Sequence, residues 1–428
     1  MISRLLSLLL VTAAVSLSAD QATNVAPTKT DKPQSAAPPD GALPPLVVST
    51  DPAYDHYVSR LYAMSTVLPN GRICYVAYGR KDCEPGTDGA GPPNYLTFYY
   101  SDDKGATLHI GFFLVPPPEP AAPGGMVDPR IGQTPDGDAI VFFPTVHGGR
   151  PQRGWYSLYG CVVRNSQTGT RGTFKVGPSC YICRGTAGVP AVVGSEVLLP
   201  TFVSLRAGLK ITHDYDGVRL WRLAIREGDV IVPELISQLP DLPNLDDNSG
   251  FCDPFIVALG ERDYRMHIRA MSGPYWCDSH DRGETWNTPY QPPDIPKLKN
   301  VIYGMATDHE GELAVAYNPV RGRMQAALAV YRKNGTIAKL TFDPREPPTG
   351  THMANFVVSI DRNRDGKPTG NYIVTYDHGR NTKAAGLEAD GVNYRGAICT
   401  AIVPKASALA GKLDGVVIHD VPTHPQSR

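Results

Sequence analysis

The chain has 428 residues with a formal net charge of −1 at pH 7, and it contains 42 glycines, 40 prolines and 21 tyrosines. A charge this close to zero gives no electrostatic reason to bind nucleic acid or an anionic membrane surface, so we expect neither partner. Short runs rich in Val, Ile and Thr alternate with turns that contain Gly and Pro, and no long amphipathic helical pattern appears. The composition predicts a single large all-β domain.

The N-terminal segment has the organisation of an export signal. Arg4 precedes an apolar run at 5–15, and small residues follow at the spacing that a signal peptidase prefers, so we predict a signal peptide at 1–19. The run is too short for a membrane span. Residues 20–45 are rich in Pro, Ala, Thr and Lys, which predicts a disordered linker. We expect a secreted or periplasmic monomer whose residues 46–428 form one domain.

A unit made of an apolar strand, a polar turn and a second apolar strand recurs along the rest of the chain. Successive units begin about 50 to 70 residues apart, which is enough for a four-stranded blade with its loops. Six units predict a six-bladed β-propeller with four-stranded antiparallel blades, and the pattern alone leaves a seventh blade open. Residues 398–403 are a candidate late strand that closes the ring. The units begin near Tyr57, Val127, Arg184, Phe251, Asn300 and His352.

Eight cysteines are present, an even number that favours disulfide pairing in an exported protein. Cys180 and Cys183 form a CxxC pair of the kind found in zinc sites, but no second CxxC or His pair stands at ligand spacing. We therefore expect structural disulfides or buried thiols, and neither a metal nor another cofactor. The other cysteines are Cys74, Cys83, Cys161, Cys252, Cys277 and Cys399.

Two stretches, 101–108 and 279–286, share the pattern Ser-x-Asp-x-Gly-x-Thr followed by Leu or Trp. The pattern suits a tight hairpin, because the Asp carboxylate accepts backbone N–H groups, Gly takes the left-handed position and the apolar residue packs beneath. It resembles the Asp-box of the sialidase superfamily, in which the motif caps the outer hairpin of propeller blades. The resemblance implies a sialidase-like propeller with both turns on the surface, away from the active face.

The resemblance also implies a set of site residues. Sialidases hold the substrate carboxylate with three arginines, protonate the leaving oxygen with an Asp, and attack through a Tyr that a Glu activates. By position, Arg60 is similar to the first arginine and Arg269 to the second. Arg321 or Arg323 is similar to the third, so these side chains are predicted to converge on one face. The layout around the family's acid is similar to that around Asp88.

The sequence departs from the sialidase pattern at the nucleophile. Where the family carries Asn-Glu, this chain has Cys252-Asp253-Pro254, and where it carries Tyr-Ser, this chain has residues 352–356, His-Met-Ala-Asn-Phe. A Tyr is a poor nucleophile until a carboxylate takes its proton, so loss of both members removes that covalent route. We expect negligible hydrolysis of simple sialosides, unless Tyr275 or Tyr376 reaches the site from a neighbouring blade.

Other polar residues stand at the ends of predicted strands, where a propeller presents side chains to its central face. Asp128-Pro129-Arg130 and Asp253-Pro254 begin two units, His147 follows another strand, and residues 376–380 close the sixth. An Asp-Pro pair is also a common strand-start turn, and His147 is equally a loop histidine, so the structural interpretation stays open. The candidate catalytic residues are Asp88 (with Asp82 as its alternative), Asp128, Asp253, His147, Tyr376, Asp377 and His378, and the further candidate substrate-binding residues are Arg80, Arg130 and Arg380.

Three functions fit this pattern, in the following order. The first is a glycoside hydrolase for a carboxylate-bearing glycan, with Asp88 or Asp128 as the acid and Asp253 or Asp377 as its partner. The second is a polysaccharide lyase, in which arginines neutralise a uronate carboxylate while His or Tyr removes the adjacent proton. The third is a non-catalytic propeller that binds glycan or protein. The first two require a glycan substrate.

Overall fold

The computed structural model describes residues 47–49, 60–79, 95–115, 126, 128–150, 153–163, 171–182, 184–204, 217–226, 230–239, 252–270, 273–298, 303–320, 324–345, 353–378 and 397–422. The expected signal peptide and linker lie outside these residues. Within them, no helix is both long enough and apolar enough to cross a membrane.

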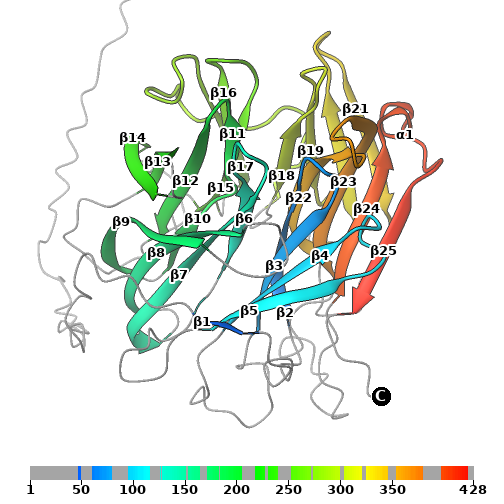
Figure 1. Ribbon diagram of the computed structural model, residues 1–428. Helices are drawn as coiled ribbons and strands as arrows, with labels where there is room; N and C mark the ends of the chain where they lie inside the picture. The colour runs from blue at the N-terminus through cyan, green and yellow to red at the C-terminus, as the bar shows by residue number, and fades with distance from the viewer. Residues whose placement is uncertain are drawn as a thin grey trace, which may run out of the picture.

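The described chain is almost entirely β-structure and forms six antiparallel sheets, the blades of a propeller (Figure 1). In blade 1 the N-terminal strand β1 adds a fifth strand next to β5, and in blade 3 the inner strand is divided into β10 and β11, which both pair with β12. The strands of blades 1 to 3 are β1 (Val47–Ser49), β2 (Arg60–Val67), β3 (Ile73–Gly79), β4 (Leu96–Ser101), β5 (His109–Val115), β6 (Arg130–Gln133), β7 (Ala139–Arg150), β8 (Arg153–Val163), β9 (Arg171–Ile182), β10 (Arg184–Ala187), β11 (Ala191–Val193), β12 (Glu196–Ser204), β13 (Gly217–Arg226) and β14 (Val230–Leu239).

Blades 4 to 6 follow in chain order. Blade 4 has three strands, β15-β16-β17, whereas blades 5 and 6 have four each. Residues 398–403 lie in β24, the third strand of blade 6, between β23 and β25, so they do not close the ring by joining the first blade. The elements are β15 (Cys252–Ala258), β16 (Tyr264–Ala270), β17 (Gly273–Ser279), β18 (Gly304–Thr307), β19 (Leu313–Tyr317), β20 (Ala326–Tyr331), β21 (Ile337–Asp343), β22 (Met353–Arg362), β23 (Pro368–His378), β24 (Ala397–Pro404), α1 (Lys405–Ala410) and β25 (Val417–Pro422).

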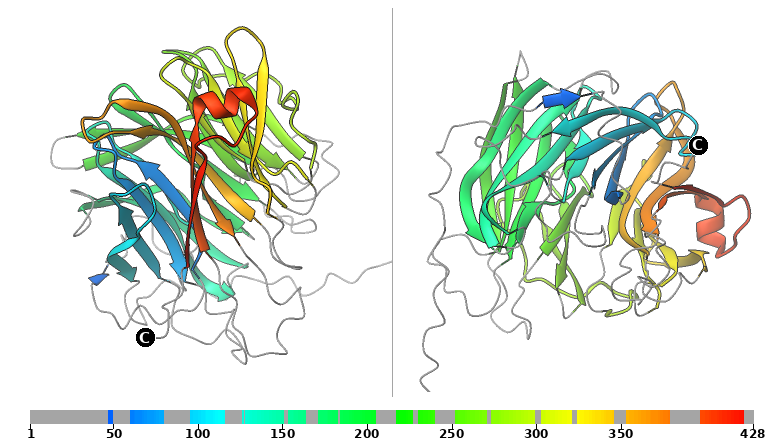
Figure 2. Two further views of the ribbon diagram at one scale, coloured as in Figure 1. Left: turned by 90° about the vertical axis from the view of Figure 1, so that its right-hand side faces the viewer. Right: turned by 90° about the horizontal axis from the view of Figure 1, so that it is seen from below.

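The inner strands of successive blades touch one another and close a ring. Strand β2 contacts β6, β6 contacts β11, β11 contacts β15, β15 contacts β18, and β18 contacts β22. The ring closes where β22 and β23 of the last blade contact β2 of the first, which Figure 2 shows as blue strands beside orange ones. The expected six-bladed propeller is therefore confirmed.

Side chains form the seam between the last blade and the first. Ser65 Oγ donates to Thr375 Oγ1 at 2.8 Å, and the Tyr75 hydroxyl lies 2.9 Å from Thr400 Oγ1. Around these bonds an apolar cluster joins residues of β2, β3 and β4 to Ile373 of blade 6. Because both pairs are fully buried hydrogen bonds inside an apolar layer, they align the two sheets as well as hold them together.

Four of the eight cysteines are buried free thiols, namely Cys74, Cys161, Cys277 and Cys399. Of the two expected states, these four are buried thiols and not disulfides, and each packs as a small apolar side chain within a core cluster. Burial raises the pKa of the Cys161 thiol to about 12, so it stays protonated and unreactive. The side chains of Cys83, Cys180, Cys183 and Cys252 lie outside the described residues.

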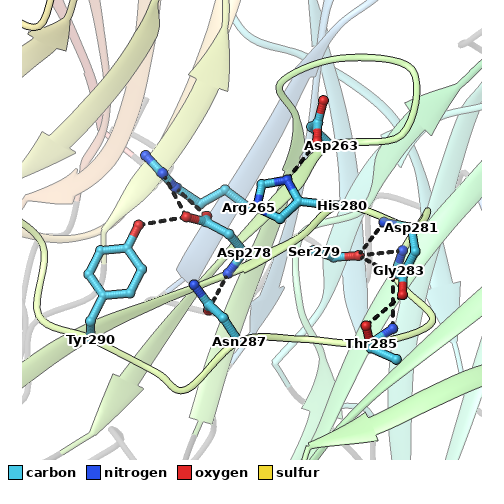
Figure 3. Close-up of polar contacts among 10 residues, drawn as sticks. All are labelled: Asp263, Arg265, Asp278, Ser279, His280, Asp281, Gly283, Thr285, Asn287 and Tyr290. Carbon is cyan, nitrogen blue, oxygen red and sulfur yellow. Dashed lines mark hydrogen bonds and ion pairs between the residues drawn. The ribbon is translucent and has the colours of Figure 1, made fainter.

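The two Ser-x-Asp-x-Gly-x-Thr turns have the same hydrogen-bonded structure. In the second turn, shown in Figure 3, Ser279 Oγ accepts from the Gly283 N–H at 2.8 Å and donates to Asp281. Asp281 also accepts from the N–H of Thr285 at 2.9 Å. The first turn repeats each bond at the same distances, and both turns follow the third strand of their blade. The predicted hairpin chemistry is confirmed.

Each turn also packs against the blade that precedes it in the ring. A Cβ added to Gly105 would lie 2.6 Å from Thr400 of β24, and one added to Gly283 would lie 2.4 Å from Leu220 of β13. Both partners are on third strands of the preceding blade. The turns therefore act as contacts between blades, and their glycines are needed for close approach as well as for φ values of +90° and +87°.

The outer edge of blade 4 is held by polar side chains instead of a fourth strand. Arg265 binds both carboxylate oxygens of Asp278, at 2.7 and 2.9 Å, and the Tyr290 hydroxyl donates to the same carboxylate at 2.8 Å (Figure 3). Tyr290 also pairs with Trp276 through two backbone hydrogen bonds. The guanidinium lies 4.4 Å from the Trp276 ring centre, so the segment is fixed by charge and stacking together.

We predict that Gly283→Ala lowers the free energy of unfolding by about 2–4 kcal/mol, because a left-handed backbone is unfavourable for Ala and its methyl group would overlap Leu220. The matched control is Gly335→Ala, which has a similar φ of +81° but no atom within 4 Å. It should cost only the backbone part, about 1 kcal/mol. Urea denaturation of both variants measures the difference, and equal losses would exclude the contact between blades.

A second prediction concerns acid. Hydrogen bonds from Thr285, and then from Ser279, lower the pKa of Asp281 to about 2, below its usual 3.8. A lowered pKa adds stability that is present above about pH 4 and is lost as the pH falls toward 2. Asp281→Asn should therefore be less stable by about 0.5–1.5 kcal/mol at neutral pH, with a gap that shrinks below pH 4. Parallel unfolding curves from pH 7 to 3 test this, and a constant gap would contradict it.

Candidate functional site

The predicted site residues that the structure describes lie at one end of the ring, here called the entry face. It is the end at which the inner strands β6, β15 and β22 begin and at which their partners β7, β16 and β23 end. Since neighbouring strands are antiparallel, the turns after the third strands, including both Ser-x-Asp-x-Gly-x-Thr turns, fall at the opposite end. The strand topology thus separates the turns from the candidate site.

Near the start of three inner strands lies a polar residue in the left-handed backbone conformation. Asp128, Asp253 and Asn355 have φ values of 41°, 46° and 58°, and they stand at the starts of blades 2, 4 and 6. The pairing register shifts at Asp253 and Asn355, as in a β-bulge. Residues other than Gly rarely adopt this conformation, and Asn and Asp are the ones that tolerate it best. Such strain gathers at functional sites, where the fold holds side chains in a set direction.

Asp253 joins two arginines into a buried charge cluster. Arg130 Nη2 lies 2.9 Å from Asp253 Oδ1, and Arg269 Nη2 lies 2.6 Å from Oδ2. The exposed fractions of Arg130, Asp253 and Arg269 are 1%, 1% and 5%. Arg130 also donates from Nη1 to the carbonyl oxygens of Pro129 and Asp128, at 3.0 and 3.3 Å. The three side chains come from two blades and carry a combined charge of +1.

This geometry gives Asp253 the role of a counter-ion. Each oxygen of its carboxylate contacts a guanidinium, and the side chain has no exposed surface. A carboxylate held in this way is a poor proton donor or nucleophile, because protonation or attack would leave two buried cations without their partner. Arg130, equally buried, orients Asp253, whereas Arg269 stands near the end of β16 at the entry face.

A second buried cluster lies at the seam between blades 6 and 1. Asp377 Oδ1 accepts from the Ala63 N–H at 3.0 Å, and its other oxygen accepts from the side-chain amide of Asn355. Asn355 has no exposed surface. Asp377 therefore fixes the first blade against the last and at the same time orients the amide that occupies the predicted nucleophile position.

The predicted cluster at 376–380 is divided between the two faces of β23. Tyr376 has no exposed surface and donates its hydroxyl to Asp343 at 2.6 Å, on the face opposite Asp377. Burial, and then the charges around it, raise the Tyr376 pKa well above its usual value, so the structure gives no sign of an activated phenol. His378 is half-buried, and burial followed by the Arg345 charge lowers its pKa. Tyr275, the other candidate for a relocated nucleophile, packs against the core cluster of blades 3 and 4.

Sequence reasoning missed His267, which lies two residues before Arg269 on the same face of β16. Its ring is 1% exposed and packs edge-to-face on Tyr303, with ring centres 4.8 Å apart. Burial, opposed by Asp253 and reinforced by Arg269, lowers the pKa of His267 to about 3, so the ring is neutral at physiological pH. The two-residue period of a strand, which places His267 on the same face as Arg269, is the signal that could have identified it.

Several predicted site residues cannot be placed. Arg60 and His147 belong to β2 and β7, but their side chains lie outside the described part of the structure. The convergence of Arg60, Arg269 and Arg323 therefore stays a prediction. The residues that lie entirely outside the described ranges are Asp82, Asp88, Arg80, Arg321, Arg323 and Arg380.

Within the described residues, one group has the composition of a metal site, formed by Asp308, Glu310 and Glu312. It already contains a cation, because Lys405 Nζ lies 2.5 to 2.8 Å from a carboxylate oxygen of each. Asp308 also accepts from the Tyr372 hydroxyl at 3.1 Å. The group fastens α1 to blade 5 at the end opposite the entry face, and it is better described as an ion-pair cluster than as a metal centre.

Comparison with known proteins agrees with this architecture. No protein-family model matches the sequence, and no curated protein matches it either. Among solved structures, the chain is similar to the NanB sialidase from Streptococcus pneumoniae, with 12% identity and a TM-score of 0.54 over 77% of this chain and 66% of that one. The chain has a sialidase-like propeller fold. It spans about two thirds of the NanB chain.

Two further structures share this sialidase-like propeller over nearly their whole length. The intramolecular trans-sialidase from Ruminococcus gnavus, in complex with oseltamivir carboxylate, is 10% identical, with a TM-score of 0.54 over 78% of this chain and 92% of that one. A protein of unknown function from Dyadobacter fermentans is 13% identical, with a TM-score of 0.52 over 79% and 94%. At these identities the likeness concerns the fold, and the chemistry of the entry face has to be argued from its own residues.

The charge cluster predicts a large stability effect. Asp253→Ala should lower the free energy of unfolding by about 3–5 kcal/mol, because it leaves two buried guanidiniums without their shared carboxylate. Asp263→Ala is the control, since its ion pair with His280 is exposed and its loss should cost less than about 1 kcal/mol. Guanidinium-induced unfolding measures both. Unchanged stability in Asp253→Ala would contradict the prediction that Asp253 stabilises the fold by pairing with the two buried guanidiniums.

Proposed function

We propose that the protein is a glycosidase that binds a carboxylate-bearing glycan at the entry face and hydrolyses a glycosidic bond there. The observation that carries the proposal is the buried Arg130–Asp253–Arg269 cluster, in which two guanidiniums share one carboxylate. A positively charged group with fixed, planar donors is suited to binding a carboxylate, because guanidinium and carboxylate pair through two parallel hydrogen bonds.

The structural neighbours support the same ligand class. Two of the three compared above are described as a sialidase and as a trans-sialidase in complex with oseltamivir carboxylate, a ligand that is itself a carboxylate. The cluster in this chain lies where the inner strands begin, around the axis of the ring. Arg269 on β16 is the side chain that we assign to ligand binding, and Arg60 and Arg323 are its expected partners.

The reaction that fits the described residues is direct attack by water. The nucleophile position carries the Asn355 amide, Tyr376 is buried against Asp343, and Asp253 is held between arginines. A glycosidase without a protein nucleophile uses one carboxylic acid to protonate the leaving oxygen. A second carboxylate takes a proton from the water that attacks the opposite face of the sugar and inverts the anomeric centre. Asp88 and Asp128 remain the candidates for that acid.

The second candidate function is a binding propeller without turnover. It is favoured by the number of predicted catalytic groups that have structural contacts instead: Asp253 with two arginines, Asp377 with Ala63 and Asn355, and Tyr376 with Asp343. In this function the arginine cluster serves recognition alone.

We predict negligible hydrolysis of simple sialosides and measurable cleavage within a panel of acidic oligosaccharides, with an inverted product anomer in proton NMR. Asp128→Asn should reduce the rate by about 100-fold or more if Asp128 is the acid. A product that absorbs in the ultraviolet would indicate elimination by a lyase. Saturable binding of the same panel without any product would establish the binding propeller. Robust sialoside turnover with retention would contradict the proposed reaction.

A further inference from the structure

The amide of Asn355 is fixed in one orientation by its neighbours. Asp377 accepts from the Ala63 N–H through Oδ1 and faces the Asn355 amide with Oδ2. An ionised carboxylate only accepts hydrogen bonds, so the amide must turn its NH₂ group toward Asp377. The carbonyl oxygen, Asn355 Oδ1, then points away from that carboxylate.

This carbonyl oxygen is buried, and it accepts no hydrogen bond from the described residues. Buried polar atoms in native proteins nearly always have a partner, because an unmet acceptor is destabilising. The left-handed backbone at Asn355 and the shift in strand register around it keep the side chain in this position. The residue therefore presents a rigid acceptor that requires a donor from outside the described protein.

We propose that Asn355 Oδ1 is a fixed acceptor for one O–H donor at the inner end of the ligand site. The donor is a buried water in the free protein and a sugar hydroxyl when a glycan is bound. The inference rests on the proposed function for the identity of the ligand. It assigns a role in recognition to the position at which sialidases carry their nucleophile: a ligand with a hydroxyl at that point binds better than one without it.

Full burial of Asn355 limits the size of the group that reaches it. A water molecule and a single hydroxyl are small O–H donors, whereas a carboxylate has no proton to donate. The arginine cluster and the amide thus differ in what they recognise. The guanidiniums bind the anionic end of the ligand, and Asn355 binds a neutral O–H donor.

The test compares binding by wild type, Asn355→Gly and Arg282→Gly. Glycine adopts the φ of 58° at position 355 without strain, so the first variant removes the amide and keeps the backbone. Arg282 has a φ of 66° in the turn at the opposite end and is the matched control. Calorimetric titration with N-acetylneuraminic acid, D-glucuronic acid and D-galacturonic acid should show one of them binding roughly three- to tenfold more weakly to Asn355→Gly, with Arg282→Gly unchanged. Thermal unfolding confirms that each variant is folded.

A crystal structure of the wild type with ordered waters provides the second measurement. The proposal expects an ordered water oxygen within about 3.2 Å of Asn355 Oδ1 and a sugar hydroxyl in its place when a probe is bound. Folded Asn355→Gly with wild-type affinity, or a protein N–H or O–H bonded to Oδ1, would overturn it. If no acidic sugar binds the wild type, the proposed function fails. The inference is then decided by the free protein alone: a water bonded to Asn355 Oδ1 supports it, and a protein donor bonded to this atom contradicts it.

Discussion

Among the described residues, nearly all backbone hydrogen bonds join strands of the same blade. The ring therefore depends on contacts between the side chains of neighbouring blades. Among the described residues, one short backbone bridge between Val189 and Phe255 crosses from blade 3 to blade 4. Elsewhere the contacts between blades are apolar clusters and a few buried polar bonds, such as Ser65 with Thr375. An assembly of this kind tolerates a variable number of strands per blade, because the inner strands and the packed faces carry the ring.

The same dependence places the chemistry of the entry face. The inner strands are where successive blades meet around the axis, and near the starts of three of them the chain places polar residues in the left-handed conformation. Asp253 pairs arginines from two blades, and Asp377 bonds one blade's backbone to another's side chain. Asp253 and Asp377 therefore stabilise the contacts between blades and also lie in the candidate site. For this reason, substitution of either residue is expected to change folding as well as function.

The features that could be predicted from the sequence are those whose contacts are local. The Ser-x-Asp-x-Gly-x-Thr turns close over four residues, from Ser279 to Gly283 and from Asp281 to Thr285, and the strand pattern repeats at a readable period. The Arg130–Asp253 pair is separated by 123 positions and the Asn355–Asp377 pair by 22. No local sequence pattern therefore predicts either contact. Arg130 and Asp253 were recognised as polar residues at strand starts, but their partnership emerges only when blades 2 and 4 meet around the axis. His267 was missed because a buried histidine in an apolar strand resembles ordinary core.

The incomplete fourth blade has a consequence for behaviour in concentrated solution. A sheet that stops at its third strand would expose a row of unpaired backbone groups, a template on which another chain can add a strand and aggregate. Here the segment that covers β17 is rich in proline, at positions 289, 292, 293 and 296, and proline has no N–H with which to extend a ladder. Tyr290, the residue that does pair with Trp276, is fixed by Asp278 and Arg265. The blade thus ends in a cap that occupies the sheet edge and offers little to a further strand.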